Sequence, residues 1–393
     1  MSDPADRPLR VGFVVSYFYP FASGAERQAL AQGLELVRRG HTVHVITRAV
    51  PGYPIEEEDY RGVFIHRWVR TWDRGPFFAL SFVAGVIQAL HRLSSKLDLI
   101  HTHQALWEAV ATGLYHKARQ NLPTLVQPAS SGHYGEADEL RRTRGRSYLR
   151  KAILQNTAFA AISAEIERQW SDLGVPCGHI ARMASGVDTE HFRPGPTALE
   201  DELLPRPRVM FTGRLHPQKN LPLLLQAWKE VAGQTSASLI LVGPGTDRES
   251  LADLAVELGI SNRVQFVGAV ADPADYLRAA DLFVLPSLAE GMSNSLLEAM
   301  ATGLPCIVSG IGGNTDLITD RQTGRVVNSP TPKAWAKVII ELLRDVEQGR
   351  QIGSEARRRT DEHFSLRVVV DRYITLYHDM ITGRWPTGTR QQP

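Results

Sequence analysis

The sequence predicts an α/β protein with two doubly wound, Rossmann-like domains. Apolar strand-like segments alternate with amphipathic helix-like segments along most of the 393 residues, as in parallel sheets covered by helices. A Pro-rich tract within residues 185–207 interrupts this alternation, which then begins again. The chain is also long enough for two domains of ordinary size, each with its own core.

The first domain is expected to span residues 1–184. Residues 10–16 predict a buried parallel strand, because they are apolar on both faces. A helix follows over 24–39, and residues 41–47 form the next strand. Such a βαβ unit places its loops at the carboxyl edge of the sheet, where ligands of these sheets bind. The other elements expected in this domain are strands at 97–101, 124–127, 159–163 and 179–183, and helices at 105–119 and 164–173.

The second domain is expected to span residues 208–365, after a linker at 185–207. Its strands are expected at 208–212, 238–242, 264–267, 282–285 and 306–309. Its helices are expected at 221–231, 248–258, 272–277, 332–346 and 348–364, and a last helix covers 366–381. Two domains of this kind favour a ligand cleft between them.

Composition limits the classes of function. The chain is 43% hydrophobic and 22% charged, which is typical of a soluble globular protein, and its net charge of +2 is too small to indicate nucleic-acid binding. The two cysteines, Cys177 and Cys306, lack metal-ligand or redox spacing, which fits a reducing compartment. We expect a cytoplasmic chain, because no signal peptide is visible and the longest apolar run, 75–90, is shorter than the ~20 residues of a membrane span.

The most informative stretch is Glu290-Gly-Met-Ser-Asn-Ser-Leu-Leu-Glu298. It follows an apolar strand and opens a helix, so two carboxylates flank one strand-to-helix turn. Ser293, Asn294 and Ser295 lie where unpaired helix N–H groups point outward and the helix dipole favours an anion. The stretch suits a phosphorylated ligand whose sugar hydroxyls bind the carboxylates. Ser295 and Glu298 also fit a capping box, which is a purely structural alternative.

A turn that carries two cations follows the first strand of the second domain. In Gly213-Arg-Leu-His-Pro-Gln-Lys-Asn220, Arg214 and Lys219 lie beside a helix start, and Gly213 gives a ligand room to approach. Two converging cations suit a diphosphate better than any requirement of the fold. The glycine-rich turn Val242-Gly-Pro-Gly245 lacks the dinucleotide spacing and is weak evidence of a nicotinamide cofactor.

Two turns of the first domain are also candidates. In Ser23-Gly-Ala-Glu26, Gly24 would let the backbone approach a phosphate or a sugar, although an ordinary glycine turn explains it as well. His101 and His103 share one face at the end of a strand. No third metal ligand is obvious nearby, so one histidine donating to a substrate hydroxyl is the simpler functional hypothesis. A strand-end histidine with only structural hydrogen bonds is the alternative.

Together these motifs resemble the GT4 family of retaining glycosyltransferases, which have the two-domain GT-B fold. The resemblance covers nearly the whole chain and implies two domains that face each other across a cleft, with residues 366–393 completing the first domain. One departure is Ser185, where the family more often has asparagine, and it should alter the hinge turn rather than the chemistry. The resemblance rests on Glu290-x7-Glu298, Gly213-Arg214 with Lys219-Asn220, Ser23-Gly-Ala-Glu26, and Ser185-Gly-Val-Asp188 before Phe192-Arg-Pro194.

The resemblance implies a role for each motif residue. Arg214 and Lys219 would bind the donor diphosphate, Glu298 the ribose and Glu290 the hydroxyls of the transferred sugar. His103 would lie near that sugar, Gly24 would close on the diphosphate, and Val267 would hold the nucleobase through its backbone. The implied catalytic residues are Arg214, Lys219, Glu290 and His103. The implied donor-binding residues are Gly24, Gly213, Val267, Gly291, Met292, Ser293, Asn294 and Glu298.

The implied reaction moves a hexosyl group, with retention, from a UDP- or GDP-sugar to a hydroxyl of a glycan, a lipid-linked molecule or a small molecule. Cations and a helix dipole aimed at the leaving diphosphate would supply most of the catalysis. We expect no cofactor besides the donor substrate and, because the chain has no metal-ligand cluster, no metal ion. Two alternatives are a nucleotide-sugar epimerase of the same fold and a nucleotide-sugar-binding protein without transfer activity.

The acceptor side has one local signal. Aromatic residues are crowded within residues 68–82 among arginines, and residues 139–151 carry six basic residues against one acid. Aromatics beside cations suit anionic lipid headgroups, so peripheral contact with the inner face of the membrane is one expectation. A core helix at 77–90 and a solvated basic face are the alternative. The aromatic residues are Trp68, Trp72, Phe77, Phe78 and Phe82, and the arginines among them are Arg67, Arg70 and Arg74.

Overall fold

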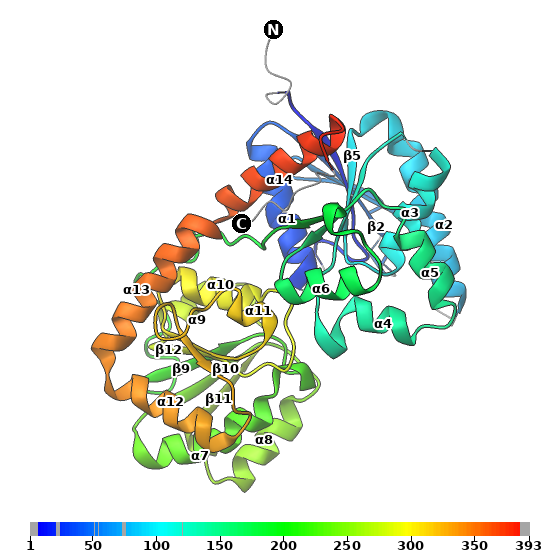
Figure 1. Ribbon diagram of the computed structural model, residues 1–393. Coiled ribbons are helices and arrows are strands. Elements are labelled where there is room, and N and C mark those ends of the chain that lie inside the picture. Colours follow the sequence, from blue (N-terminus) through cyan, green and yellow to red (C-terminus); the bar gives the residue numbers. More distant parts are fainter. Residues whose placement is uncertain are drawn as a thin grey trace. The chain divides into compact units, whose positions relative to one another are not determined.

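The computed structural model describes residues 7–20, 24–50, 52–53, 55–72, 76–119 and 121–385. The chain divides into two compact α/β units, the first formed by Met1–Gly186 with Leu366–Pro393 and the second by Val187–Ser365 (Figure 1). The chain passes from one unit to the other at two places, after Gly186 and after Ser365. The segments at these two places are hydrogen-bonded to each other, because the Val187 N–H donates to the Phe364 carbonyl at 2.9 Å. The cleft expected between the two units stays a prediction.

The described part of the first unit contains an eight-stranded sheet in the order β3-β4-β2-β1-β5-β6-β7-β8. Neighbouring strands are parallel except β3 and β4, which form an antiparallel hairpin at one edge. The central strands are buried on both faces, which explains their continuous apolar sequences. The strands are β1 (Arg10–Val14), β2 (Thr42–Arg48), β3 (Glu57–Tyr60), β4 (Val63–Val69), β5 (Leu99–His103), β6 (Thr124–Gln127), β7 (Ala158–Ala161) and β8 (Ile180–Arg182).

Helices cover both faces of this sheet. The last helix, α14, packs against α1, and the Tyr377 hydroxyl lies 2.7 Å from Nδ1 of His101. The Arg39 guanidinium also donates to the Arg367 carbonyl at 2.8 Å, so the C-terminal segment completes the first unit. The helices are α1 (Gly24–Arg38), α2 (Pro76–Leu93), α3 (Trp107–Arg119), α4 (Glu136–Arg142), α5 (Arg146–Ile153), α6 (Ala164–Asp172) and α14 (Leu366–Ile381). Short 3-10 turns are η2 (Ser94–Lys96), η3 (Gly132–Tyr134) and η4 (Cys177–His179).

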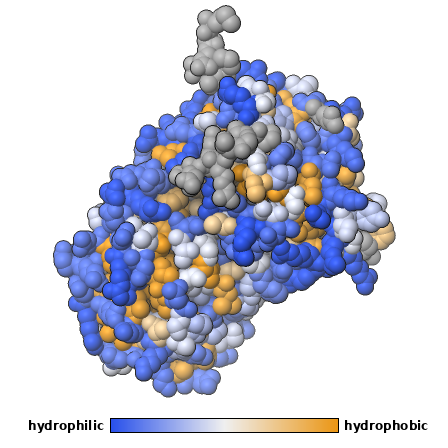
Figure 2. All heavy atoms as spheres, viewed as in Figure 1, coloured by the Kyte–Doolittle hydropathy of each residue, from blue (hydrophilic) through white to orange (hydrophobic). Residues whose placement is uncertain are grey.

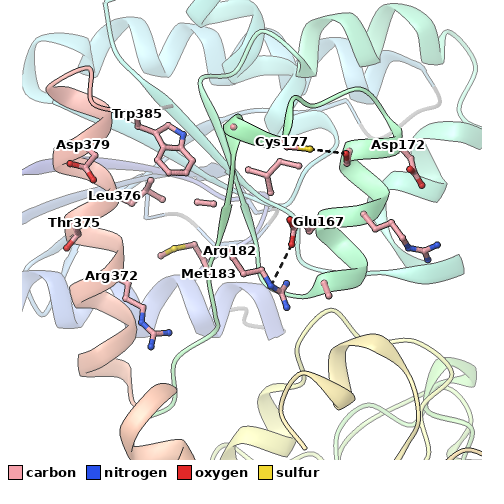
Figure 3. A pocket seen from close by; sticks show the side chains of 16 residues that line it. Glu167, Asp172, Cys177, Arg182, Met183, Arg372, Thr375, Leu376, Asp379 and Trp385 are labelled. Atoms are coloured by element: carbon pink, nitrogen blue, oxygen red, sulfur yellow. Dashed lines mark hydrogen bonds and ion pairs between the residues drawn. The ribbon is translucent and has the colours of Figure 1, made fainter. Parts of the chain in front are cut away.

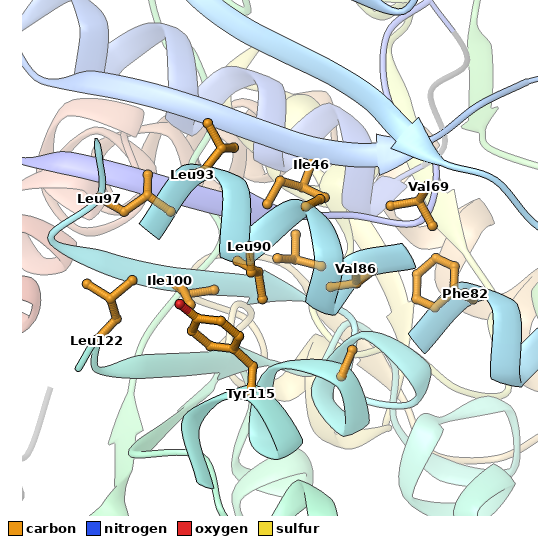
Figure 4. Close-up of a cluster of buried hydrophobic side chains, with 13 residues drawn as sticks. Ile46, Val69, Phe82, Val86, Leu90, Leu93, Leu97, Ile100, Tyr115 and Leu122 are labelled. Carbon is orange, nitrogen blue, oxygen red and sulfur yellow. The ribbon is translucent and has the colours of Figure 1, made fainter. Parts of the chain in front are cut away.

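Helix α2 builds a large part of the core of this unit. Phe82, Val86 and Leu90 point from it towards Ile46 of β2 and Val69 of β4 (Figure 4). By length and composition, Phe77–Lys96 is long and apolar enough to cross a membrane. The prediction that the longest apolar run is too short for a span was therefore wrong. Because its inner face forms the core, α2 is held against the sheet.

The second unit, within the residues described, has a six-stranded parallel sheet in the order β11-β10-β9-β12-β13-β14. The strands are β9 (Arg208–Thr212), β10 (Ser238–Val242), β11 (Val264–Gly268), β12 (Leu282–Leu285), β13 (Cys306–Ser309) and β14 (Arg325–Val327). The helices are α7 (Leu221–Gln234), α8 (Arg248–Glu257), α9 (Ala274–Arg278), α10 (Asn294–Ala301), α11 (Gly312–Thr315), α12 (Pro332–Arg344) and α13 (Val346–His363). The 3-10 turns are η5 (Pro217–Lys219) and η6 (Ser261–Arg263).

The strand order of this sheet reverses between β9 and β12. The chain runs from β9 outward to β11 and then returns to the other side of β9 with β12. Such a switch point is where open parallel sheets bind ligands, at the carboxyl ends of the strands. The loops after β9 and β12, which carry the strongest sequence motifs, therefore lie beside each other. The predicted doubly wound α/β fold is confirmed.

The tract 185–207 packs against the second unit along much of its length, although the sequence indicated a linker. The Thr197 hydroxyl donates to the Asp275 carbonyl at 2.9 Å, and the Leu204 N–H donates to Gln265 Oε1 at 2.9 Å. Arg208, which is buried, donates to the Leu204 carbonyl at 2.6 Å. These bonds hold the tract in place, and the chain passes between the units at Gly186 and Val187.

Candidate active site

The loops after β9 and β12 are joined by an ion pair. Lys219 Nζ lies 2.5 Å from Glu290 Oε1, and the two side chains are 13% and 8% exposed. The Leu288 N–H donates to the Gln218 carbonyl and the Gln218 side-chain amide donates to the Ala289 carbonyl, each at 2.8 Å. The structure thus brings together two motifs that lie about seventy residues apart in sequence.

A chain of hydrogen bonds fixes the Glu290 carboxylate. Its Oε1 also accepts from the Ser287 hydroxyl at 2.6 Å. The Ser287 carbonyl accepts from Ser309 Oγ at 2.5 Å, and the Asn314 side-chain amide donates to the Ser309 carbonyl at 3.1 Å. Sequence reasoning missed Ser287, Ser309 and Asn314. Ser287 and Ser309 lie at or just beyond the carboxyl ends of β12 and β13, and that position is the signal that could have identified them.

Arg214 is the exposed cation of this site. It lies on the surface and makes no hydrogen bond or ion pair with the residues that the structure describes. Lys219, on the same turn, is instead drawn inward by Glu290 and its side chain is 13% exposed. Arg214 therefore offers a guanidinium that the fold does not use.

Glycines allow the loop that carries Arg214 to pack against the loop after β10. A Cβ on Gly243 would lie 2.0 Å from the Gly213 carbonyl oxygen, and one on Gly245 would lie 2.0 Å from that of Leu215. Gly213 itself has a φ of 148°, which favours glycine. The Leu215 N–H donates to the Pro244 carbonyl at 2.7 Å. Loop packing thus explains these glycines without a nicotinamide cofactor.

The N-terminus of α10 lies directly after this pair of loops. Ser293 is its N-cap, and its hydroxyl accepts from the Leu296 N–H at 3.4 Å. The capping box predicted from Ser295 and Glu298 is wrong, because the helix begins two residues earlier and Leu296 occupies the third position. Glu298 is buried further along the helix. The first turn of α10 presents the positive end of its dipole.

The other predicted donor-binding residues line the same edge. Gly291 and Met292 are buried in the turn before α10, and Asn294 is its first residue. Val267, half-buried, precedes Gly268, whose carbonyl accepts from the Gly243 N–H at 2.8 Å. The end of β11 is therefore joined to the loop after β10. All of these positions belong to the second unit.

His103 of the first unit is a buried, neutral imidazole at the end of β5. Its ring stacks on that of His101 with centroids 4.2 Å apart, and it meets Phe13 edge-on. Burial lowers the pKa of His103 to about 3. In the described part of the chain, Nε2 of both histidines has no hydrogen-bond partner, but Nδ1 of His101 meets the Tyr377 hydroxyl. His101 thus fits the structural role, and the contact of His103 with the sugar stays a prediction.

Gly24 is exposed at the first position of α1, and Ser23 of its motif lies outside the described residues. Its contact with the donor diphosphate stays a prediction. Within the part of the chain that the structure describes, no group of three or more His, Cys, Asp or Glu side chains could hold a metal ion.

Glu108 is a titratable residue that sequence reasoning missed. It lies in the first turn of α3, is buried, and accepts a hydrogen bond from the Ser16 hydroxyl after β1. Burial, with smaller contributions from Glu136 and Glu26, raises the pKa of Glu108 to about 7. An acid within the apolar helix start Trp107-Glu-Ala-Val was the available signal.

A separate cavity of about 660 Å³ lies in the first unit between α6, β8 and α14 (Figure 3). Acidic and basic side chains share its wall, and Glu167 lies 4.0 Å from Arg182 across part of it. None of the predicted site residues lines it. This cavity is therefore distinct from the loops that carry the motifs.

The chain matches two glycosyltransferase families and is similar in sequence to known enzymes. Residues 22–191 match the family described as Glycosyltransferase Family 4, and residues 206–345 match the family described as Glycosyl transferases group 1. The chain is 26% identical to N-acetyl-alpha-D-glucosaminyl L-malate synthase of Bacillus anthracis, over 95% of this chain and 97% of that protein. It is 29% identical to D-inositol 3-phosphate glycosyltransferase of Nocardia farcinica, over 89% and 85%.

Solved structures share the fold. Sucrose-phosphate synthase from Thermosynechococcus elongatus has a TM-score of 0.83 at 23% identity, covering 95% of this chain and 100% of that one. Anabaena HepE in complex with UDP-glucose has a TM-score of 0.78 at 20% identity, covering 94% and 98%. Two parallel-sheet units of this kind place the protein among the GT-B-fold enzymes. The protein is a glycosyltransferase whose first unit matches Family 4 and whose second unit matches the group 1 glycosyl transferases. Glycosyl transfer is thus favoured over epimerisation or binding alone.

Proposed function

We propose that this glycosyltransferase moves a hexosyl group from a UDP-sugar to a hydroxyl acceptor, with retention of configuration and without a metal ion or cofactor. Among its relatives are a D-inositol 3-phosphate glycosyltransferase and an N-acetyl-alpha-D-glucosaminyl L-malate synthase. A structure of the same fold is a complex with UDP-glucose, which supports uridine as the base. A glycan, a lipid-linked molecule or a small molecule would supply the hydroxyl.

The observation that carries this proposal is the pairing of Lys219 with Glu290 beside the N-terminus of α10. A UDP-sugar has a diphosphate next to a polyhydroxylated ring. Cations and a helix N-terminus suit the diphosphate, and an oriented carboxylate suits the hydroxyl groups of the ring. Exposed Arg214, on the same loop as Lys219, adds a second cation for the diphosphate.

Catalysis would come chiefly from charge stabilisation. Cleavage of the bond between sugar and phosphate builds negative charge on the leaving UDP, and preorganised cations aimed at that charge lower the barrier. Arg214 and Lys219 would do this without a metal ion. Glu298, on α10, would bind the ribose.

Glu290 would orient the sugar rather than attack it. Its Oε1 already accepts hydrogen bonds from both Lys219 and Ser287, so this oxygen is committed to positioning. With no enzyme nucleophile, the acceptor hydroxyl would approach the face that UDP leaves, and the departing phosphate would take its proton. That geometry gives retention.

Alanine variants of the two cations test the proposal. We expect Arg214→Ala to lower kcat/KM for UDP release from a UDP-sugar by ~10²–10³-fold, comparable to the loss of one oxyanion donor. Lys219→Ala should have a similar effect. Arg350→Ala, an exposed arginine on α13, is the matched control and should be unchanged. Near-normal kcat/KM in a folded Arg214→Ala enzyme would refute the diphosphate assignment.

A further inference from the structure

Helix α2 is apolar on its outer face as well as on its inner one. The inner face packs into the core (Figure 4). On the outer face, Phe77, Leu80 and Ala84 follow one another at helical spacing and are exposed, Phe77 by 55% and Leu80 by 68%. A surface helix ordinarily carries polar residues there. Within Phe77–Lys96, only 28% of the most apolar 18-residue stretch is buried. Packing inside the fold therefore does not account for the apolar residues on the outer face.

Trp72 extends this exposed apolar surface. Its ring is 70% exposed, which is unusual for tryptophan, and lies 6.5 Å from the Phe77 ring between centroids. The backbone N–H of Trp72 donates to Ser81 Oγ at 3.0 Å, and that hydroxyl donates to the Phe77 carbonyl at 2.7 Å. The backbone of Trp72 is therefore joined to the first turns of α2. We call Trp72, Phe77, Leu80 and Ala84 the α2 outer patch.

Basic residues lie at the same edge of the first unit. Helix α3 packs between α2 and α5, so the three helices lie on one face of the sheet (Figure 1). Helices α2 and α3 begin after the carboxyl ends of β4 and β5, and α4 and α5 follow the carboxyl end of β6. The first turns of α2, α3 and α5 therefore lie at the carboxyl edge of the sheet. We call five exposed basic side chains of α4, α5 and the turn between them the α5 cations. They are Arg141, Arg142, Arg144, Arg146 and Lys151. Arg150 is left out because its Nε donates to the Leu173 carbonyl at 2.5 Å.

The α5 cations outnumber the acids around them. Asp138, paired with Arg142 at 2.7 Å, and Glu139 are the acidic side chains of α4 on this side. Tyr148 lies among the cations and is 81% exposed. Figure 2 shows pale and orange residues among blue ones where Figure 1 labels α2 and α5. This edge thus combines exposed aromatic rings with unbalanced positive charge.

We propose that the α2 outer patch and the α5 cations form one surface that binds an anionic lipid bilayer. Aromatic and aliphatic side chains insert at the boundary between headgroups and acyl chains, and cations bind anionic headgroups beside them. Charge complementarity selects a bilayer with net negative charge. The helix lies on the bilayer rather than across it, because its inner face forms the core of the unit. This inference is independent of the proposed donor and acceptor.

Vesicle flotation of the full-length chain tests this surface. The probes are vesicles of phosphatidylcholine alone and of phosphatidylcholine mixed in equal parts with phosphatidylglycerol, without donor or acceptor. We expect the protein to float with the anionic vesicles at low salt, to be released at high salt, and to stay behind with the neutral vesicles. Absence from the anionic vesicles at low salt overturns the proposal, as does equal, salt-insensitive binding to both.

Two sets of variants locate the contact. Trp72→Ser, Phe77→Ser and Leu80→Ser together should weaken partitioning at least tenfold. Arg144→Gln, Arg146→Gln and Lys151→Gln together should weaken it roughly a hundredfold on anionic vesicles, given the contribution expected per cation. The matched controls lie in the second unit: Val256→Ser with Val346→Ser for exposed apolar residues, and Lys337→Gln with Arg350→Gln for exposed cations. They should float like the wild type.

Other readouts separate this surface from alternatives. UDP release from a soluble UDP-sugar and the thermal unfolding temperature should be unchanged in every variant, which shows that lost flotation is not lost folding. A folded apolar triple variant that floats like the wild type contradicts the proposal. So does a wild-type protein that ignores vesicles but self-associates through the α2 outer patch, seen by light scattering as loss of the oligomer in the apolar triple variant.

Discussion

Lys219 and Glu290 neutralise each other in a largely buried ion pair. Such a pair is costly to break from one side, because the remaining charge has no partner. A diphosphate would compete for the Lys219 ammonium and could replace Glu290 as its counter-ion. Ser287 would then keep the carboxylate in place through its own hydrogen bond. The serine therefore makes the position of Glu290 independent of where Lys219 points.

Glu108 makes the stability of the first unit depend on pH. Its pKa is raised from 4.5 to about 7, so folding favours the protonated acid. Its contribution is full below pH 4.5 and is lost as the pH rises through about 7. We expect Glu108→Gln to be as stable as the wild type near pH 5 and more stable by roughly 1–3 kcal/mol near pH 8.

Urea unfolding at several pH values measures this difference. The pKa of His103 is lowered to about 3, so this residue makes the protein less stable as the pH falls below 6.5, which is opposite to the effect of Glu108. Comparing the variant with the wild type at each pH cancels the contribution of His103. Glu165→Gln, at a partly exposed acid on α6, serves as the control and should show no such rise with pH. A constant difference between Glu108→Gln and the wild type across this range would contradict the assignment.

At the scale of elements, the site depends on segments that touch through glycines. The loop after β9 carries Arg214 and Lys219, and it lies against the loop after β10 where Gly243 and Gly245 leave room. Helix α11, after β13, approaches the loop after β12 in the same way, since a Cβ on Gly313 would lie 2.4 Å from the Gly291 carbonyl oxygen. Backbone packing of this kind fixes the cations relative to α10.

Gly243→Ala should disturb this packing. The added Cβ would meet the Gly213 carbonyl oxygen at 2.0 Å, and the φ of 137° disfavours any side chain. We expect a loss of roughly 2–4 kcal/mol in the free energy of unfolding, as for a strained, overpacked site, and weaker binding of UDP. Gly233→Ala near the end of α7 has open space around its Cβ and should change stability by less than ~1 kcal/mol. Equal behaviour of the two variants in urea unfolding and UDP titration would disprove the packing role.

The sequence predicted most elements, and those it missed have physical reasons. Strands such as β9, β10 and β12 are short apolar runs between turn residues, and they occur where expected. β3 has the polar sequence Glu-Glu-Asp-Tyr and becomes a strand only by pairing with β4 at the sheet edge. The Arg-rich helix α5 depends on packing against α3. Local patterns do not contain these tertiary contacts.

The candidate site was predictable to the extent that it is local. Glu290, Ser293 and Glu298 follow one strand, and their spacing indicated a ligand-binding turn. The bond between Glu290 and Lys219 joins residues 71 positions apart, and the bond from Ser309 to the Ser287 carbonyl joins residues 22 positions apart. The periodicity of apolar residues and the spacing of motifs in the sequence do not identify partners that only folding brings together. The burial that shifts the pKa of Glu108 is likewise a property of the folded unit.

At the scale of the molecule, the donor loops all belong to the second unit, which has its own sheet and core. A ligand that binds the folded protein stabilises it by ~2.7 kcal/mol at a concentration of 100 Kd. We expect UDP to raise the unfolding temperature more than GDP or ADP, and to do so equally with magnesium and with EDTA. Differential scanning fluorimetry measures this shift. Stabilisation that requires magnesium would contradict metal independence, and a larger shift with GDP would contradict the uridine donor.

Proton NMR of the reaction with a panel of UDP-α-sugars tests the central claim most directly. In the proposed mechanism, Arg214, Lys219 and the first turn of α10 help UDP leave and no enzyme nucleophile takes part. We therefore predict slow release of UDP even without an acceptor, together with free sugar that first appears as the α-anomer and only later mutarotates. A β-anomer at the earliest times would contradict retention. Isomerised UDP-sugar with no free UDP would contradict glycosyl transfer itself.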